Sequence, residues 1–401
     1  MSIIRIGDVC TWAKGYQVPR DDTSVDKEIP YLHYGDLYKL YGFRLDLEEK
    51  YDQIIKIDAD SKIKTEQYLH DGDIVFTFTS ETVDDLGHCT LIINPADRPF
   101  VTGMETTVVH ITNRESVLPA YLNYYFQSRK FQREVRQFVT GMKVYRVHPD
   151  DLMDMVIDIP EMVIQKRIVA ALDPFSDKIL ANTKLNANLA SIIDSIFTET
   201  IKSSQGETTR FGSMIKIGSG GTPKTAISEY WNGDIPFFSP KDVDGIYVYS
   251  TEKYITKMGL DNCNSGYYPK NTTFITARGT VGKIALAASN MAMNQSCYAI
   301  SANTLGQEHY IHQLSLYAVG AIKQKSNGAI FDAINARDIT EELVPNVPLP
   351  RIEAFEKQAT PLYEQIWKNG LEIESLVHLR DYLLPKLMSG EIDVSDLPLP
   401  N

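Results

Sequence analysis

The stretch EMVIQKRIVAALDPFSDKILANTKLNANLASIIDSIFTETIKS, residues 161–203, carries apolar side chains three and four residues apart. This spacing places them on one face of an α-helix. Asp173 followed by Pro174 is typical of an N-cap and a first helical residue, which predicts a helix of about 40 Å from there to Lys202. The apolar face comprises Ile168, Leu172, Phe175, Ile179, Leu189, Ile193 and Ile196.

A second stretch of the same kind follows Pro350, and Thr360-Pro361 is its matching start. Two long helices with one apolar face each can bury those faces on one another, so we expect an antiparallel coiled coil. Asn182 and Asn186 interrupt the first face and Asn369-Gly370 the second. A buried Asn that sets the register explains them as well as an exposed turn does. The second face comprises Leu362, Ile366, Ile373, Leu376, Leu379, Leu383 and Leu387.

The segments that precede the two helical stretches match each other in order. Arg5-Ile6-Gly7 matches Arg210-Phe211-Gly212, and the buried-strand pattern DIVFT (73–77) matches TTFIT (272–276). Further matches join 29–37 to 235–243, Gly87 to Gly282, 104–109 to 294–299, Gly141 to Gly328, and Asp151-Leu152 to Asp338-Ile339. The series predicts an internal duplication.

The duplication predicts an α+β fold of two tandem mixed α/β domains, each followed by a long helix. We expect the first domain at 1–160 and the first long helix with its linker at 161–205. The second domain is expected at 206–350, and the second long helix with a C-terminal tail at 351–401.

Composition restricts the function classes. The 401 residues have a formal net charge of −12, and the acidic excess falls in 1–160 and 351–401, so the overall charge indicates no nucleic-acid footprint. No apolar run approaches the roughly 20 residues that cross a bilayer, and the N-terminus lacks a signal-peptide pattern. The four cysteines lie far apart, which suits a reducing cytoplasm. We therefore expect a cytoplasmic protein without a membrane partner.

The sequence does not match the nucleotide-binding, nuclease or metal-site motifs that it partly resembles. The glycine-rich stretch SGGTPK (219–224) lacks the Walker A spacing, and Pro223 removes a backbone N–H that phosphate binding needs. Glu48-Glu49-Lys50 has the Glu-x-Lys form of some nucleases but lies in a charged, polar stretch. His309 and His312 are three residues apart without a third ligand nearby in sequence. We predict no catalytic residue, no metal site and no cofactor site.

The strongest binding signal is RKFQREVRQFVTGMKVYR (129–146), with six basic residues and one acidic residue. Such side chains neutralise phosphates and reach base edges, although a solvated basic helix is the alternative. Arg129, Arg133 and Arg136 would share one helical face, and a turn at Thr140-Gly141 would present a second group. The candidate DNA contacts are Arg129, Arg133, Arg136, Lys143, Tyr145 and Arg146 in the first copy, and Ser219, Gly220, Thr222, Lys224, Arg278, Lys283, Lys323 and Lys325 in the second.

Several motifs together resemble the DNA-specificity subunit of type I restriction-modification systems. They are SGGTPK, YWNGDIPFFSPKDV, ARGTVGKIAL, NQSCYAI, IPEMVIQKRIVAAL and the ending LRDYLLPKLMSGEI. The resemblance runs from Arg5 to about Val394. The first domain departs from it, since Lys14-Gly15-Tyr16-Gln17 replaces the glycine-threonine-proline turn and Glu105-Thr106 stands where Asn294-Gln295-Ser296 fits.

The resemblance implies that each domain reads one half of a bipartite, asymmetric site in double-stranded DNA. The helix pair would set the spacer and dock two methyltransferase (modification) subunits, and restriction endonuclease subunits could join. Catalysis and cofactors would belong to those partners. Two alternatives stay open: a duplicated module that binds protein or carbohydrate, and a stand-alone DNA methyltransferase or nuclease.

Overall fold

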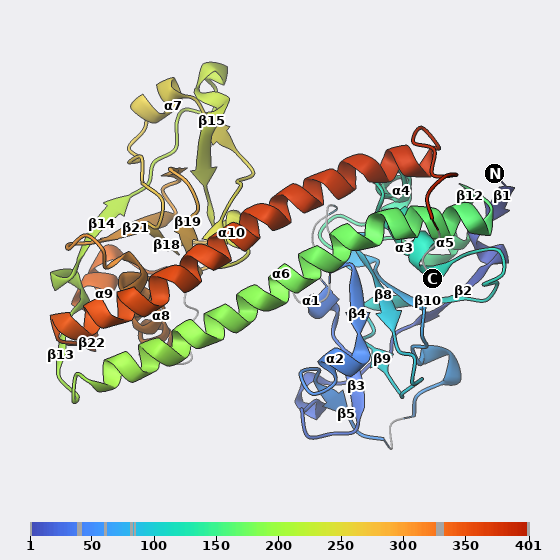
Figure 1. Ribbon diagram of the computed structural model, residues 1–401, viewed down its shortest axis with the longest axis horizontal. Coiled ribbons are helices and arrows are strands. Elements are labelled where there is room, and N and C mark those ends of the chain that lie inside the picture. Colours follow the sequence, from blue (N-terminus) through green and yellow to red (C-terminus); the bar gives the residue numbers. More distant parts are fainter. Residues whose placement is uncertain are drawn as a thin grey trace. The chain divides into compact units, whose positions relative to one another are not determined.

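The computed structural model describes residues 2–37, 42–59, 62–80, 83, 86–325 and 333–398 (Figure 1). The chain forms two compact units. The first comprises Met1–Asp177 and Leu376–Asn401, and the second comprises Lys178–Ser375. Two long helices, α6 (Met162–Lys202) and α10 (Leu349–Met388), each contribute residues to both units.

Each unit contains a five-stranded sheet of the same topology, which confirms the duplication. In the first unit the order is β2 (Cys10–Lys14), β10 (Thr106–Ile111), β6 (Ile74–Thr77), β8 (Cys89–Ile93) and β4 (Arg44–Asp46). In the second it is β14 (Ile215–Ser219), β21 (Cys297–Ala302), β18 (Thr273–Thr276), β19 (Ile284–Ala287) and β16 (Tyr247–Val248). In both sheets the last pair is parallel and the others are antiparallel.

The smaller sheets repeat as well. A three-stranded sheet has the order β5 (Lys56–Ile57), β3 (Ile29–Leu32), β9 (Val101–Thr102) in one unit, and β17 (Tyr254–Ile255), β15 (Trp231–Phe238), β20 (Ala292–Met293) in the other. A two-stranded ribbon pairs β1 (Ser2–Arg5) with β12 (Val156–Ile159), and β13 (Thr208–Arg210) with β22 (Leu343–Pro345). The first unit also pairs β7 (Thr79–Ser80) with β11 (Tyr145–Arg146).

Further helices lie between the strands. The first unit has α1 (Tyr34–Asp36), α2 (Leu47–Lys50), α3 (Pro119–Gln127), α4 (Arg129–Val135) and α5 (Pro149–Asp154). The second has α7 (Lys257–Asp261), α8 (Glu308–Lys325) and α9 (Ala336–Glu341). Single 3₁₀ turns lie at Ile6–Asp8, Arg20–Asp22, Thr65–Gln67, Arg136–Phe138, Phe211–Ser213, Ser228–Tyr230 and Pro240–Asp242.

The strand registers refine the match between the copies. Gly87 and Gly282 are equivalent as expected, because each has a positive φ and donates its N–H to the last residue of β6 or β18. Thr107 pairs with Lys14 and Tyr298 pairs with Ser219, so Thr107 is equivalent to Tyr298. The expected match of 104–109 with 294–299 is therefore displaced by one residue. Gly328, expected to match Gly141, lies outside the described residues.

The expected helix starts are wrong. Pro174 lies inside α6 and Pro361 inside α10, and both helices begin 12 residues earlier. A proline in a helix removes one hydrogen bond and costs about 3 kcal/mol. The additional turns stay helical because they bury side chains of both helices: Ile168 and Leu172 of α6 in the first unit, and Ile352 and Phe355 of α10 in the second.

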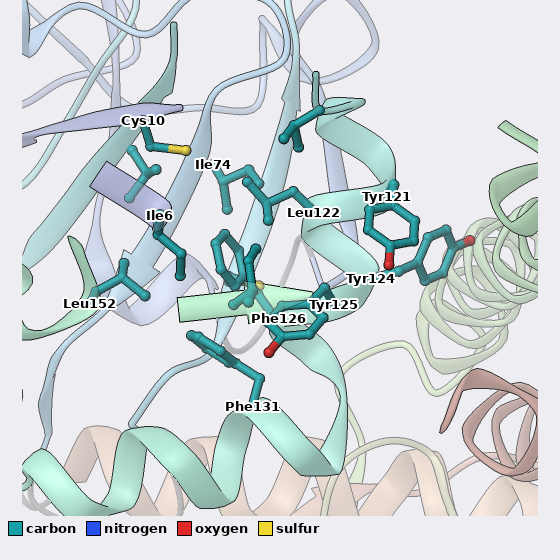
Figure 2. Packing of buried hydrophobic residues seen from close by; sticks show 14 of the residues in the cluster. Ile6, Cys10, Ile74, Tyr121, Leu122, Tyr124, Tyr125, Phe126, Phe131 and Leu152 are labelled. Atoms are coloured by element: carbon teal, nitrogen blue, oxygen red, sulfur yellow. The ribbon is translucent and has the colours of Figure 1, made fainter. Parts of the chain in front are cut away.

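Both long helices take part in each hydrophobic core. In the first unit, the rings of Tyr125 and Phe126 of α3 pack against Phe131, whereas Tyr121 and Tyr124 lie on the other side of α3, as Figure 2 shows. Leu384 and Leu387 of α10 complete that core. In the second unit, Ile193 and Phe197 of α6 pack in one cluster with Phe355 and Tyr363 of α10. Leu379, expected on the apolar face, is 47% exposed instead. The aromatic residues of α3 in the first core are Tyr121, Tyr124, Tyr125 and Phe126.

Candidate nucleic-acid interface

One edge of the second five-stranded sheet collects most of the candidate residues of that unit. β14 ends at Ser219 and β18 at Thr276, and these pair with the first residues of β21. The N–H of Ala277 donates to the carbonyl of Ser296 at 2.7 Å. The turn 219–224, the loop 277–283 and the loop 294–296 therefore lie at one edge of the sheet.

The glycines of the turn 219–224 permit close packing against the neighbouring loop. A Cβ on Gly220 would lie 1.8 Å from the carbonyl oxygen of Asn294. The N–H of Gly221 donates to Met293 at 3.0 Å, and the Thr222 hydroxyl donates to the side-chain oxygen of Gln295. This packing leaves three candidates exposed, which are Ser219, Thr222 and Lys224.

The first unit builds the same turn with a different sequence. A Cβ on Gly15 would lie 1.9 Å from the carbonyl oxygen of Gly103. The N–H of Tyr16 donates to the backbone carbonyl of Thr102 at 2.7 Å. Gly15 is therefore equivalent to Gly220, although the residues around it differ. The sequence signal that could have found this equivalence is the position of each glycine directly after the first sheet strand.

Cationic side chains surround the loop 277–283. Arg278 is exposed, and the ammonium group of Lys283 donates to the carbonyl of Val243 at 3.2 Å. Lys323, near the end of α8, donates to the carbonyl of Gly282 at 2.8 Å. Lys325 instead forms an ion pair with Glu342, with N–O distances of 2.6 and 2.8 Å. The Glu342 carboxylate is buried, so the ion pair with Lys325 neutralises a buried charge within the unit.

In the first unit the chain turns back at 140–146, as expected. Thr140 and Arg146 exchange two backbone hydrogen bonds, both 2.9 Å long. Arg146 also pairs with Thr79, directly beyond the end of β6. Lys143 and Arg146 are exposed, while Tyr145 packs against the core. This turn therefore lies at the edge that corresponds to the edge in the second unit.

The arginines of the adjacent helix share a solvent-exposed face. Arg129, Arg133 and Arg136 are exposed, whereas Phe131 and Val135 on the other side of α4 are buried. The guanidinium of Arg133 donates to the carbonyl of Arg129 at 3.2 Å. The helical face expected from the spacing is thus present.

The two copies differ in this segment. Arg278 pairs with Ala333 as Thr79 pairs with Arg146, so Ala333 stands at the position of Arg146. By the same offset Lys323 matches Arg136, and Lys325 matches Phe138. The two lysines therefore precede the counterpart of the turn 140–146, and most of that counterpart lies outside the described residues. Thr79, which pairs with Arg146 at this edge, is not among the candidates from the sequence because it carries no basic or aromatic side chain.

The long helices meet in a polar layer within the second unit. Asn182 donates to Glu372 at 2.7 Å, and Asn369 donates to Asn186 at 2.8 Å. Asn182 and Asn369 are 3% and 4% exposed, so they are buried and do not form an exposed turn. The order of the pairs shows that α6 and α10 run antiparallel. The hydrogen bond from Asn182, together with Lys178, lowers the pKa of Glu372.

His309, His312 and Glu48, whose residue types occur in metal and nuclease sites, each have a partner within the chain. His309 lies 2.9 Å from the Glu356 carboxylate, and His312 lies 2.7 Å from the Tyr363 hydroxyl. Burial lowers the pKa of His312 to about 3, so its ring is neutral. Glu48 pairs with Arg98 at 2.7 Å. Among the described residues, no group of three His, Cys, Asp or Glu side chains is placed to hold a metal ion, and no helix is long and apolar enough to span a membrane.

Comparison with known proteins gives a family match over most of the chain. The family model "Type I restriction modification DNA specificity domain" matches residues 1–191 and 204–362. The MjaIX specificity subunit of Methanocaldococcus jannaschii is 30% identical over 152 residues, which cover 37% of this chain and 34% of that protein. The EcoR124I/EcoR124II specificity subunit of Escherichia coli is 31% identical over 130 residues, which cover 31% of this chain and 32% of that protein.

Other matches extend over nearly the whole chain. A putative MjaX specificity subunit of M. jannaschii is 22% identical over 409 residues, covering 95% of this chain and 88% of that protein. The crystal structure of the type I restriction-modification S subunit from M. genitalium superposes with a TM-score of 0.54 at 15% identity, over 96% of this chain and 95% of that one. The match to MjaIX spans only about a third of that relative's length.

Proposed function

This chain belongs to the type I restriction-modification DNA specificity domain family, and on this premise we propose that each of its two domains reads one half of a bipartite, asymmetric site in double-stranded DNA. The observation that carries the proposal is the repeated sheet edge. In both copies exposed basic and turn residues lie beside the ends of equivalent strands. Two such edges with different side chains suit two half-sites of different sequence.

The basic side chains at each edge fit phosphate and base contacts. In the first domain Lys143 and Arg146 extend from a turn whose backbone is closed by two hydrogen bonds. In the second domain Arg278, Lys283 and Lys224 come from other segments at the corresponding edge of the sheet. Arginine and lysine neutralise phosphates, and arginine can bind a guanine edge with two hydrogen bonds. Arg129, Arg133 and Arg136 would add phosphate contacts in the first half.

The helix pair fits the role of a spacer between the two half-sites. The polar layer of Asn182 and Asn369 opposes sliding of α6 along α10, because a shifted register would leave buried amides without partners. We propose the domain boundaries given by the sequence, with domains at 1–160 and 206–350 and the long helical segments at 161–205 and 351–401. The near-equivalence of the two copies fits the docking of two identical methyltransferase subunits.

Catalysis would reside in those partners. No catalytic residue is predicted from the sequence, so methylation, and cleavage by restriction endonuclease subunits, would be performed by other chains with their own cofactors. The net negative charge agrees with this division, because partner subunits could supply much of the phosphate contact.

Single-molecule methylation sequencing of host DNA, with and without this gene, tests the proposal. We expect a bipartite adenine-methylated motif with a fixed spacer to disappear on deletion. Exchanging residues 206–350 for those of a relative should change one half of the motif and leave the other half unchanged. An unchanged methylation pattern, together with no salt-dependent DNA binding by the purified chain, would contradict the proposal and favour a protein- or carbohydrate-binding module.

A point substitution tests the assignment of the edge. Arg146→Ala should weaken methylation of the motif while co-purification with the methyltransferase subunits stays normal. Arg5→Ala is the matched control, because Arg5 is an exposed arginine of the same domain on the ribbon β1–β12 and its ion pair with Asp154 is exposed. Such ion pairs contribute little to stability. Equal methylation by the two variants would contradict a DNA contact at Arg146.

A further inference from the structure

Met142 lies at the tip of the turn 140–146 and is 92% exposed. A single exposed apolar side chain is common on protein surfaces. Its surroundings are less common, because Lys143 follows it directly and Arg146 closes the turn. Val144, on the same turn, is 41% exposed. The turn thus presents an apolar tip with cations beside it.

The backbone holds this tip in a fixed position. Gly141 has φ +104°, and a Cβ there would lie 2.1 Å from the carbonyl oxygen of Val144, so the tight conformation requires glycine. Behind the turn, the N–H of Val147 donates to the carbonyl of Phe78 at 3.0 Å, and Tyr145 packs against the core. Little conformational freedom of the turn backbone remains to be lost on binding.

The charge pattern around the tip matches duplex DNA. Phosphates line the rims of a groove, and apolar base surfaces lie between them. The exposed cations of the turn and of α4 would contact the phosphates at the rims, and the Met142 side chain would reach toward the bases. Glu134, the one acidic residue of 129–146, lies 3.5 Å from the Tyr125 hydroxyl. Unbranched methionine is among the side chains that proteins insert against base steps.

We propose that the first domain places the side chain of Met142 against the bases of its half-site, between phosphates bound by Lys143 and Arg146. This inference rests on the proposed function. Met142 would supply an apolar contact that depends on the base sequence, whereas the neighbouring cations supply contacts that do not. The residue is thus a specificity determinant of the first half-site.

Salt dependence separates the two kinds of contact. The probe is a duplex selected by the full-length chain from a random-sequence library, and its affinity is measured by fluorescence anisotropy over a series of salt concentrations. Met142→Ala should bind about ten- to fiftyfold more weakly at every salt concentration, because it loses buried apolar atoms and no charge. Lys143→Ala should instead reduce the steepness of the salt dependence by about one unit.

Two variants serve as controls. Leu305→Ala removes an apolar side chain that is 93% exposed and follows the far end of β21, away from the candidate edge, so its affinity should equal that of the unmodified chain. Met142→Leu should retain most of the affinity. Because Met142 is exposed, thermal unfolding should be the same for all Met142 variants.

The possible outcomes are distinguishable. If the unmodified chain selects no duplex, the proposed function fails and the inference fails with it. If the chain selects a duplex that Met142→Ala binds equally well, the inference alone is wrong. A loss for Met142→Ala that disappears at high salt would also overturn it, because such a loss would reflect displaced phosphate contacts.

Discussion

Replacing Gly370 with alanine tests how the second domain packs against α10. Gly370 is buried within the helix, and a Cβ there would lie 2.0 Å from atoms of the Tyr249 ring. The Tyr249 hydroxyl donates to the carbonyl of Ile366 at 3.0 Å, one turn earlier in the same helix. Alanine therefore cannot be accommodated unless the ring moves and this hydrogen bond is lost.

The expected free-energy change is the sum of opposing contributions. Alanine in a helix interior is about 1 kcal/mol more favourable than glycine. Overpacking against the ring costs about 1–3 kcal/mol, and the lost hydrogen bond costs about 1 kcal/mol more. We expect Gly370→Ala to lower the free energy of unfolding by about 1–3 kcal/mol.

Gly320→Ala is the matched control, because Gly320 lies within α8 and a Cβ there would meet no atom within 4 Å. This variant should raise the free energy of unfolding by up to about 1 kcal/mol. Urea unfolding followed by tryptophan fluorescence measures both variants. Trp367, three residues before Gly370, donates its indole N–H to the carbonyl of Ala288 at 2.9 Å and so reports on this unit.

A double variant identifies the cause. In a Tyr249→Ala background the obstructing ring is absent, so Gly370→Ala should stabilise by about 1 kcal/mol. The reasoning would be refuted if Gly370→Ala were as stabilising as Gly320→Ala in the otherwise unmodified chain. It would also be refuted if removal of the Tyr249 ring left the effect of Gly370→Ala unchanged.

Two further predictions concern stability. Gly220→Ala and Gly15→Ala should each lower the melting temperature by several degrees, because the new Cβ would meet a backbone carbonyl oxygen at 1.8 or 1.9 Å. Gly245→Ala is the control and should leave the melting temperature unchanged, because the space around Gly245 is open. An unchanged melting temperature for Gly15→Ala would contradict the equivalence of the two turns. Burial lowers the pKa of His312 to about 3, below the usual value near 6.5. Between pH 6.5 and pH 3 the unfolded chain therefore binds a proton at His312 that the folded chain does not. The free energy of unfolding consequently falls as the pH falls below 6.5. His312→Asn should lessen that loss by about 2 kcal/mol between pH 6.5 and 5 in urea unfolding, and an identical pH dependence in both proteins would show that His312 is not buried as a neutral ring.

Much of the architecture was predictable from the sequence because it follows from local periodicity. The strands β6 and β18 are buried on both faces, and the β-branched and aromatic residues of DIVFT and TTFIT indicated this. The apolar faces of the two long helices could be identified from spacing alone. The glycines Gly87 and Gly282 both have positive φ, which few other residues adopt, so their match indicated the same turn in each copy.

The candidate site was predictable only in part. The exposed face of Arg129, Arg133 and Arg136 follows from helical geometry, and the turn at Gly141 follows from its glycine. The contact of Lys325 did not follow, because its partner Glu342 is 17 residues away, directly after α9, and the Glu342 carboxylate is buried only in the folded unit. The sequence placed Lys14-Gly15-Tyr16-Gln17 at the position of the glycine-threonine-proline turn, but the close approach of Gly15 to Gly103 is visible only in the structure.

The sequence by itself determined the strand and helix types and the apolar faces of the long helices, because these depend on the burial preference of residues close together in the chain. The duplication was also predictable, since equivalent residues recur in the same order in both copies. The tertiary structure decided where the helices begin and which loops meet. Pro174 and Pro361 are tolerated only because residues before them are buried in a core formed by distant segments. The meeting of Thr222 with Gln295 joins residues 73 positions apart, and the free energy that selects such a contact comes from packing that no local pattern encodes.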